Sequence, residues 1–422
     1  MAKPVSPTFR VMGWLLATGI FFAALAFWYH PNGLSDIPES TVPMVGIEQG
    51  SSQCAYPASI ETPVPPLYPL IGAGIMATTG LGTSIIPDYH FVGSACTRAA
   101  VPRTASDSDL PLVLLGAACW PLLLGGFVAL MGVAGKGRSR WELLGLCLVA
   151  AIPALASTVI RYLHPEDMLA MGLILLACAA AIRSRWLAAG VCIGLACCAK
   201  QFAILPAVPL LIAAPRRMRL RFVIGAVATA GVILIPSAIL MGHGMLVALR
   251  GAYATPANTG TLVGRLRLHG TILVLVARVL PLVAAGVISL WAHSRLRSAI
   301  CQPEPLVGLV AVSLVMRLVF EVNLYAYYFL GTAVALIALD VIVGRIRLET
   351  ICWIVVATAF FPPQFDPLVL VGNAHPLLVQ AIVVLPAVAL VGLPVYRMCR
   401  PAPKVHRRDD YRLRGAMVVG GE

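Results

Sequence analysis

The sequence predicts an all-α, polytopic integral membrane protein with about twelve transmembrane helices. Hydrophobic residues make up 59% of the 422 residues and charged residues only 12%, whereas soluble domains hold roughly 45–50% apolar and about 25% charged residues. Apolar runs also recur along the whole chain, and a bilayer core about 30 Å thick takes about 20 helical residues per crossing. Helices are the expected spanning element because they satisfy their own backbone hydrogen bonds.

The positions of the basic residues set the predicted topology. They cluster in every second connection, and the positive-inside rule places those connections in the cytoplasm. Both termini are then cytoplasmic at the plasma membrane, with one transmembrane domain over 1–422 and a basic cytoplasmic tail at 398–422. This distribution explains the net charge of +13 without a nucleic-acid partner. The basic clusters are Lys3 and Arg10, Lys136 to Arg140, Arg183 and Arg185, Arg216 to Arg221, Arg295 and Arg297, Arg345 and Arg347, and Arg397 to Arg414.

One large outer loop, 29–109, follows the first span. It contains a further apolar segment, 67–86, whose crossing would reverse the side of every later basic loop. We therefore expect a re-entrant or interfacial helix there. The predicted spans lie near 11–28, 110–134, 142–160, 168–182, 186–199, 202–214, 222–242, 271–292, 306–320, 325–343, 350–362 and 377–396, and the fifth and sixth are separated only by Lys200-Gln201.

Two cysteines, Cys54 and Cys96, fall in the outer loop. An oxidising exterior permits a disulfide between them, and two free thiols are the alternative. The chain has no metal-type cysteine spacing. Asp107-Ser-Asp109 has a spacing that can hold a divalent cation, but an N-cap for the following helix is the simpler interpretation. No cofactor is expected, and a bound divalent metal ion is the alternative.

The stretch Arg161-Tyr-Leu-His-Pro-Glu-Asp167 holds four ionisable side chains between two apolar runs. Pro165 favours a helix start. Glu166 and Asp167 then fall in the first turn of that helix, where their negative charges interact favourably with the positive end of the helix dipole. That interpretation leaves the neighbouring His164 and Arg161 unexplained. Because charges at membrane depth are costly, such residues usually face an internal cavity.

Several other polar residues share the outer side. Asp36 comes shortly after the first span and could act as a general base toward a hydroxyl, or be a solvated loop acid. Lys200 is suited to a lipid phosphate, or could snorkel to the interface. Arg317 and Glu321 could simply pair at i,i+4 spacing. The remaining candidates for substrate contact are Arg250, Tyr325 and Tyr328, where the tyrosines could equally form an aromatic belt.

The layout resembles the GT-C superfamily of membrane glycosyltransferases, in particular the actinobacterial mannosyl- and arabinosyltransferase-like branch around glycosyltransferase family 87. The resemblance rests on an outer-loop acid (Asp36), the run Pro65-Pro66-Leu67-Tyr68, the loop His164-Pro-Glu-Asp167, and Gly194-Leu-Ala-Cys-Cys-Ala-Lys200 followed by Pro206. It covers most of the chain by architecture, through short motifs.

The resemblance implies inverting transfer of a mannose- or arabinose-type sugar from a polyprenyl-phosphate donor to a lipid or cell-envelope glycan acceptor, on the outer face of the membrane. The position of Asp36 after the first span assigns it the role of general base. Lys200, Arg161 and Arg317 are assigned to the donor phosphate because of their positive charge. The sequence departs from the family in lacking a second acid beside the first span. Glu166 and Asp167 are therefore alternative candidates for the general base, and His164 is a further candidate catalytic residue.

A multi-pass transporter or lipid flippase is the alternative from another class, and a membrane scaffold without a site is a third. A transporter requires a polar route to the inner side, for which Arg278 and Asp340 are the candidate charged residues, both expected near the inner half. No nucleotide-binding, metalloprotease or hydrolase motif occurs in a supporting context.

Overall fold

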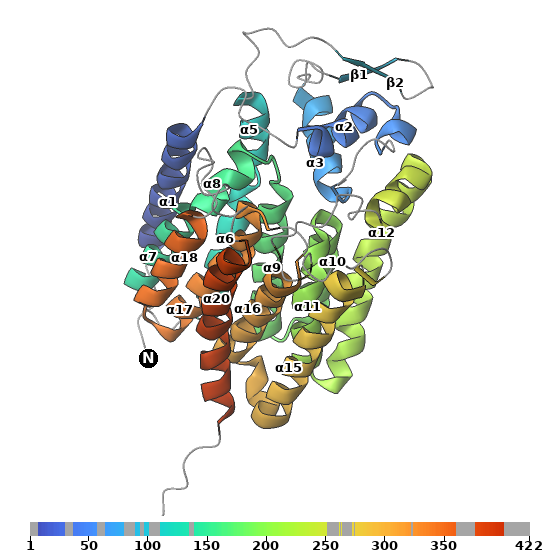
Figure 1. Cartoon of the computed structure of the whole chain (residues 1–422). Coiled ribbons are helices and arrows are strands. Elements are labelled where there is room, and N and C mark those ends of the chain that lie inside the picture. The colour runs from blue at the N-terminus through green and yellow to red at the C-terminus, as the bar shows by residue number, and fades with distance from the viewer. Residues whose placement is uncertain are drawn as a thin grey trace, which may run out of the picture.

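The computed structural model describes residues 7–29, 37–56, 64–79, 89–92, 97–100, 110–134, 139–250, 261, 263, 272–273, 275–321, 324–359 and 376–400. They form a helical bundle with a small two-stranded antiparallel ribbon at one end (Figure 1). The helices are α1 (Pro7–Trp28), α2 (Ile37–Glu48), α3 (Leu67–Thr79), α5 (Leu110–Ala117), α6 (Trp120–Ala134), α7 (Ser139–Ala150), α8 (Pro153–Ile160), α9 (Glu166–Ile182), α10 (Trp186–Ala199), α11 (Ile204–Ala213), α12 (Arg216–Arg250), α15 (Leu280–Leu296), α16 (Pro303–Phe320), α17 (Phe329–Val343), α18 (Leu348–Ala359) and α20 (Pro376–Cys399), and the strands are β1 (Tyr89–Val92) and β2 (Thr97–Ala100).

The described helices are those of a membrane protein. Six of them, counting α5 and α6 as one, are long and apolar enough to cross a membrane, or seven if the bent pair α7 and α8 is one span. The predicted helical membrane architecture is therefore confirmed at this level. The figure of about twelve spans stays a prediction, because several apolar helices are shorter than a full crossing.

The segment predicted to span the membrane at 142–160 is bent, so its crossing as one span stays a prediction. The chain bends by 40° between α7 and α8, where Ile152 adopts an extended conformation before Pro153 at the start of α8. A proline has no N–H to continue the α7 hydrogen-bond ladder and disfavours helical backbone in the residue before it. Proline chemistry thus accounts for the break.

The core is centred on α9 and α17, which are buried along almost their whole length. Helix α9 packs between α6 and α10, and α10 packs in turn on α12. Glycines bring the backbones together: a Cβ at Gly172 would lie 2.7 Å from the Leu122 oxygen, and one at Gly190 would lie 2.1 Å from the Phe222 oxygen. Small residues at helix contacts permit this approach in membranes.

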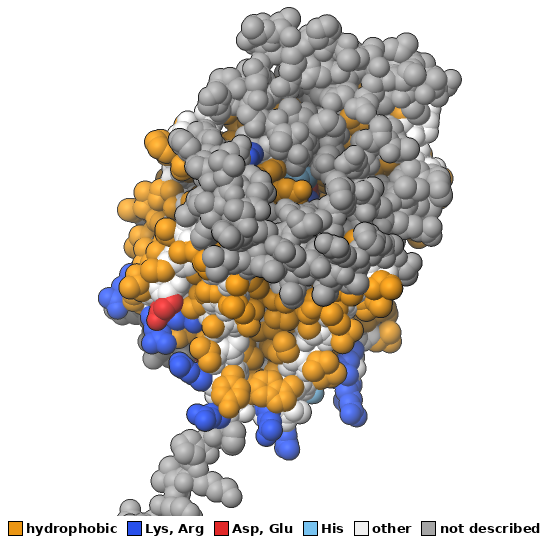
Figure 2. Space-filling model, in the orientation of Figure 1, with side chains coloured by type: hydrophobic (Ala, Val, Ile, Leu, Met, Phe, Trp, Pro, Cys, Tyr) orange, Lys and Arg blue, Asp and Glu red, His pale blue; other side chains and the backbone are white. Residues whose placement is uncertain are grey.

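The two ends of the bundle differ in character. The start of α1 and the end of α20 lie toward the same end, opposite α2, α3 and the ribbon (Figure 1). Lys and Arg side chains gather at that end, below a belt of hydrophobic side chains (Figure 2). This polarity agrees with the distribution of basic residues in the sequence, and the assignment of that end to the cytoplasm stays a prediction.

At the opposite end, α2 and α3 pack against each other, with Gly72 against Met44. Helix α3 has 13 residues and is about 20 Å long, too short to cross a bilayer. The 3-10 turn Ser52–Cys54 docks this region on α12, where Ser52 Oγ donates to the Leu240 oxygen at 3.1 Å. Cys54 is disulfide-bonded; its predicted partner, Cys96, lies outside the described residues, so that pairing stays a prediction.

Candidate functional site

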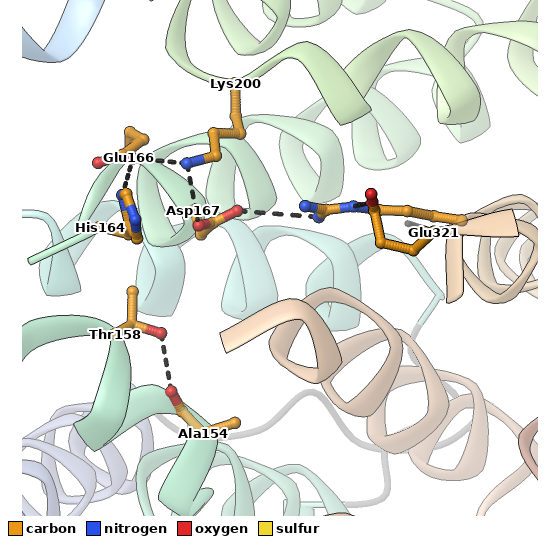
Figure 3. A network of polar contacts seen from close by, with 8 residues as sticks. Ala154, Thr158, His164, Glu166, Asp167, Lys200 and Glu321 are labelled. Atoms are coloured by element: carbon orange, nitrogen blue, oxygen red, sulfur yellow. Dashed lines mark hydrogen bonds and ion pairs between the residues drawn. The ribbon is translucent and has the colours of Figure 1, made fainter. Parts of the chain in front are cut away.

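A buried cluster of charged side chains joins three helices at the end of the bundle that carries α2 and α3. It consists of His164, Glu166, Asp167, Lys200, Arg317 and Glu321, hereafter the ion cluster (Figure 3). The residues come from the start of α9, the end of α10 and the end of α16. Positions far apart in the chain thus converge on one site.

The connection between α8 and α9 sets the position of two carboxylates. Leu163 takes a left-handed backbone conformation, with φ of 47°, which turns the chain sharply. The His164 N–H then donates to the Thr158 oxygen at 2.7 Å. Helix α9 begins directly after Pro165, as the sequence predicted, and Glu166 and Asp167 are 0% and 2% exposed. The helix dipole is therefore not their only electrostatic partner, because both carboxylates also face the cations Lys200 or Arg317.

Glu166 is the most strongly bound member of the cluster. Its Oε1 accepts a hydrogen bond from Lys200 Nζ at 2.6 Å, and His164 Nδ1 lies 2.7 Å from the same oxygen. Its second oxygen, Oε2, is buried without a hydrogen-bond partner among the described residues. Lys200 is therefore held at the turn after α10, rather than snorkelling freely to the interface.

Asp167 is held more loosely. Lys200 Nζ lies 3.5 Å from Oδ2, and Arg317 Nη1 lies 4.0 Å from Oδ1. Both distances exceed those of a normal hydrogen bond, and within the described part of the chain neither oxygen has a hydrogen-bond partner. Asp167 is thus a buried carboxylate between two cations with unused acceptor capacity.

Arg317 links the carboxylates to an aromatic surface. Its Nε lies 3.3 Å from Glu321 Oε2, the predicted i,i+4 pair. The guanidinium carbon also lies 4.1 Å from the ring centre of Tyr328 and 4.5 Å from that of Phe202. Cation–π contacts of this kind hold a guanidinium without consuming its donors, so Arg317 retains capacity for a further anion.

Tyrosines cover one side of the ion cluster. Tyr327 is 6% exposed, and its ring lies 4.5 Å from that of His164 and 5.6 Å from Lys200 Nζ. Tyr325 is 37% exposed and stacks on Tyr327 at 5.7 Å. The sequence grouped Tyr325, Tyr327 and Tyr328, with Tyr325 and Tyr328 as the candidates for substrate contact. Periodicity could not show which of them meets His164 and Lys200, because a 3-10 turn covers Ala326–Tyr328.

Arg278 lies elsewhere than the sequence indicated. It belongs to a π-turn, Leu275–Val279, that precedes α15. Its guanidinium donates to the side chain of Gln201, the residue next to Lys200. Arg278 therefore lies at the level of the ion cluster and not near the opposite end.

The ion cluster lies well inside the bundle. The helices that lead to it, α9, α10, α11, α16 and α17, have 17, 14, 10, 18 and 15 residues, which is about 15–27 Å of rise. The neighbouring stretch Arg216–Gly242 of α12 has 27 residues, or about 40 Å. Each of α9, α10, α11, α16 and α17 is thus shorter than a bilayer core about 30 Å thick.

The other predicted site residues have mixed outcomes. Arg161 ends α8, with its guanidinium 5.4 Å from the ring centre of Tyr162, which in turn contacts Tyr327. Asp36 lies outside the described residues, as does the side chain of Arg250. Within the described ranges, no group of three His, Cys, Asp or Glu side chains is placed to hold a metal ion.

No protein-family model matches the chain, and no curated protein matches it. The resemblance to membrane glycosyltransferases therefore rests on the residues and layout described above. Any function for the ion cluster has to be argued from its chemistry.

Proposed function

We propose that the protein is a membrane glycosyltransferase that moves a mannose- or arabinose-type sugar from a polyprenyl phosphate to a lipid or glycan acceptor, on the outer face of the plasma membrane. The observation that carries the proposal is the ion cluster itself. It combines two cations with two carboxylates whose oxygens keep acceptor capacity among the described residues, below the end of the bundle formed by α2 and α3.

The cations suit a phosphate leaving group. Arg317 offers a planar set of donors and Lys200 a compact charge, and both groups bind phosphate readily. In the proposed reaction, an acceptor hydroxyl oxygen bonds to the anomeric carbon while the bond from that carbon to the phosphate oxygen breaks. The electron pair leaves with the phosphate, whose developing charge Lys200 and Arg317 stabilise.

The proton of the acceptor hydroxyl has to pass to a base. Glu166 is committed to Lys200 and His164 through one oxygen, whereas both oxygens of Asp167 lack hydrogen bonds among the described residues. This contrast supports Asp167 as the base and Glu166 as the residue that orients Lys200. Asp36 stays a candidate base predicted from the sequence, because it lies outside the described residues.

The contacts of two charged residues speak against the transporter alternative. Asp340 is paired with Arg347 at 2.6 Å and also accepts a hydrogen bond from the Arg347 backbone N–H at 2.9 Å. Arg278 lies beside Gln201 at the level of the ion cluster. Neither residue is left to carry a polar route between the cluster and the basic end.

The proposal is tested with purified protein in liposomes, supplied with radiolabelled polyprenyl-phosphate mannose or arabinose and an extract of envelope lipids and glycans. Transfer is measured as label in the acceptor fraction and as release of polyprenyl phosphate. Asp167→Asn and Lys200→Gln are each expected to lower turnover by about 10²-fold or more, as loss of an acid–base or charge-stabilising group does.

Glu142→Gln is the matched control. Glu142 is also a buried carboxylate facing a cation, 3.4 Å from Arg10, but it lies on α7 near the basic end. It should leave turnover per folded molecule unchanged. Wild-type protein that transfers neither sugar, or Asp167→Asn that retains full turnover, would contradict the proposed function or the role of Asp167, respectively.

A further inference from the structure

Tyr68, on α3, has a buried hydroxyl with no hydrogen-bond partner among the described residues. The side chain is 1% exposed, so bulk solvent does not reach the hydroxyl. An unsatisfied buried hydroxyl is unfavourable, and buried polar groups in native proteins nearly always have partners. The hydroxyl of Tyr68 therefore requires an explanation outside the protein groups around it.

Tyr68 lies close to the ion cluster. Burial raises the pKa of its hydroxyl, and the negative charge of the Glu166 carboxylate raises it further. Helix α3 also contacts α10, whose C-terminus leads into Lys200. The Glu166 carboxylate in turn has an unsatisfied acceptor, Oε2. An unused donor and an unused acceptor are thus buried in the same region.

We propose that Tyr68 is a substrate-binding residue, and that its hydroxyl donates a hydrogen bond to a hydroxyl of the lipid-linked sugar, which itself donates to Glu166 Oε2. The inference rests on the proposed function and specifies which part of the substrate the outer loop contacts. A sugar hydroxyl is both a donor and an acceptor, so one group satisfies both protein atoms. The phosphate lacks that capacity and belongs with Lys200 and Arg317.

Tyr56 shows what a structural tyrosine looks like in the same region. It follows the 3-10 turn beside α12 and is also buried, at 3% exposed, but its hydroxyl donates to the Val64 oxygen at 2.8 Å. That hydrogen bond joins two parts of the outer loop and needs no ligand. Substitution to phenylalanine should therefore have opposite consequences at the two positions.

The test compares Tyr68→Phe with Tyr56→Phe in the full-length protein in detergent or lipid nanodiscs. Affinities are measured for polyprenyl-phosphate mannose, polyprenyl-phosphate arabinose and sugar-free polyprenyl phosphate, with thermal unfolding of each variant. Tyr68→Phe keeps the ring and removes only the unsatisfied hydroxyl, so unfolding should occur at or above the wild-type temperature. It should bind the matching sugar lipid about 5- to 100-fold more weakly, the effect of losing one buried hydrogen bond.

The sugar-free lipid identifies the contact. Tyr68→Phe should bind it as wild type does, and Tyr56→Phe should unfold at a lower temperature yet bind all three lipids with wild-type affinity. Equal affinity of Tyr68→Phe and wild type for both sugar lipids would overturn the inference and leave the proposed function standing. Equal weakening for all three lipids would also overturn it, because the contact would not be to the sugar. Wild-type protein that binds none of the lipids would overturn both proposals together.

Discussion

Substituting Gly190 with alanine should displace the helix that carries Lys200. An added Cβ would lie 2.1 Å from the Phe222 oxygen and 3.0 Å from the Ala226 nitrogen, both on α12. Real Cβ atoms stay at least 3.0 Å from such atoms, so the two helices must separate by about 3.0 − 2.1 = 0.9 Å. Overpacking of this size costs about 1–3 kcal/mol, which exceeds the gain of about 1 kcal/mol for replacing glycine by alanine in a helix.

The matched control is Gly231→Ala in α12. A Cβ there meets only the Ile235 Cδ1 atom, at 3.7 Å, so only the helix-propensity gain remains. Thermal unfolding of both variants, followed by tryptophan fluorescence in detergent, should therefore shift in opposite directions, down for Gly190→Ala and slightly up for Gly231→Ala. Donor-lipid affinity should fall only in the former. A Gly190→Ala protein as stable as Gly231→Ala would refute the close approach of α10 and α12.

Three further results are expected. Glu166→Gln and Lys200→Met should each destabilise the protein by about 3–5 kcal/mol, because each leaves a buried partner uncompensated; the double variant should lose less than the sum, with a coupling of about 0.5–3 kcal/mol in a double-mutant cycle. Arg317→Lys should weaken binding of sugar-free polyprenyl phosphate, measured by equilibrium binding, because lysine lacks the planar guanidinium that lies against Tyr328. Chelation with EDTA should leave sugar transfer unchanged in the liposome assay, because Lys200 and Arg317 supply the positive charge at the phosphate.

Much of the local structure could be predicted from short-range chemistry. Pro165 indicated the start of α9, Lys200-Gln201 indicated the break between α10 and α11, and the i,i+4 spacing of Arg317 and Glu321 indicated their pairing. In each case, the determining interaction lies within a few residues of chain. Composition likewise sufficed for the helical membrane class, because bilayer thickness constrains every span in the same way.

The site could be predicted only in part, because its geometry depends on contacts between distant segments. The sequence placed Lys200 and Asp167 on one side of the membrane, but the 2.6 Å bond from Lys200 to Glu166 rather than to Asp167 depends on how α9 and α10 pack. The burial and contacts of Tyr68 and Tyr327 could not be predicted, for the same reason. Their burial follows from the docking of α3 and of the 3-10 turn, which no local pattern indicates.

Structural stability alone does not account for the ion cluster. Helices α9 and α10 are already held against their neighbours by close glycine contacts at Gly172 and Gly190, and replacing a buried ion pair with apolar residues is often neutral or stabilising. In the Asp340–Arg347 pair, by contrast, Asp340 accepts from both the backbone and the side chain of Arg347. In the part of the chain that the structure describes, the ion cluster keeps oxygens without hydrogen-bond partners on Glu166 and Asp167, beside two cations. In the proposed transfer, a hydroxyl nucleophile needs such an acceptor and a phosphate leaving group needs the nearby cations, so the proposed substrate would account for these oxygens.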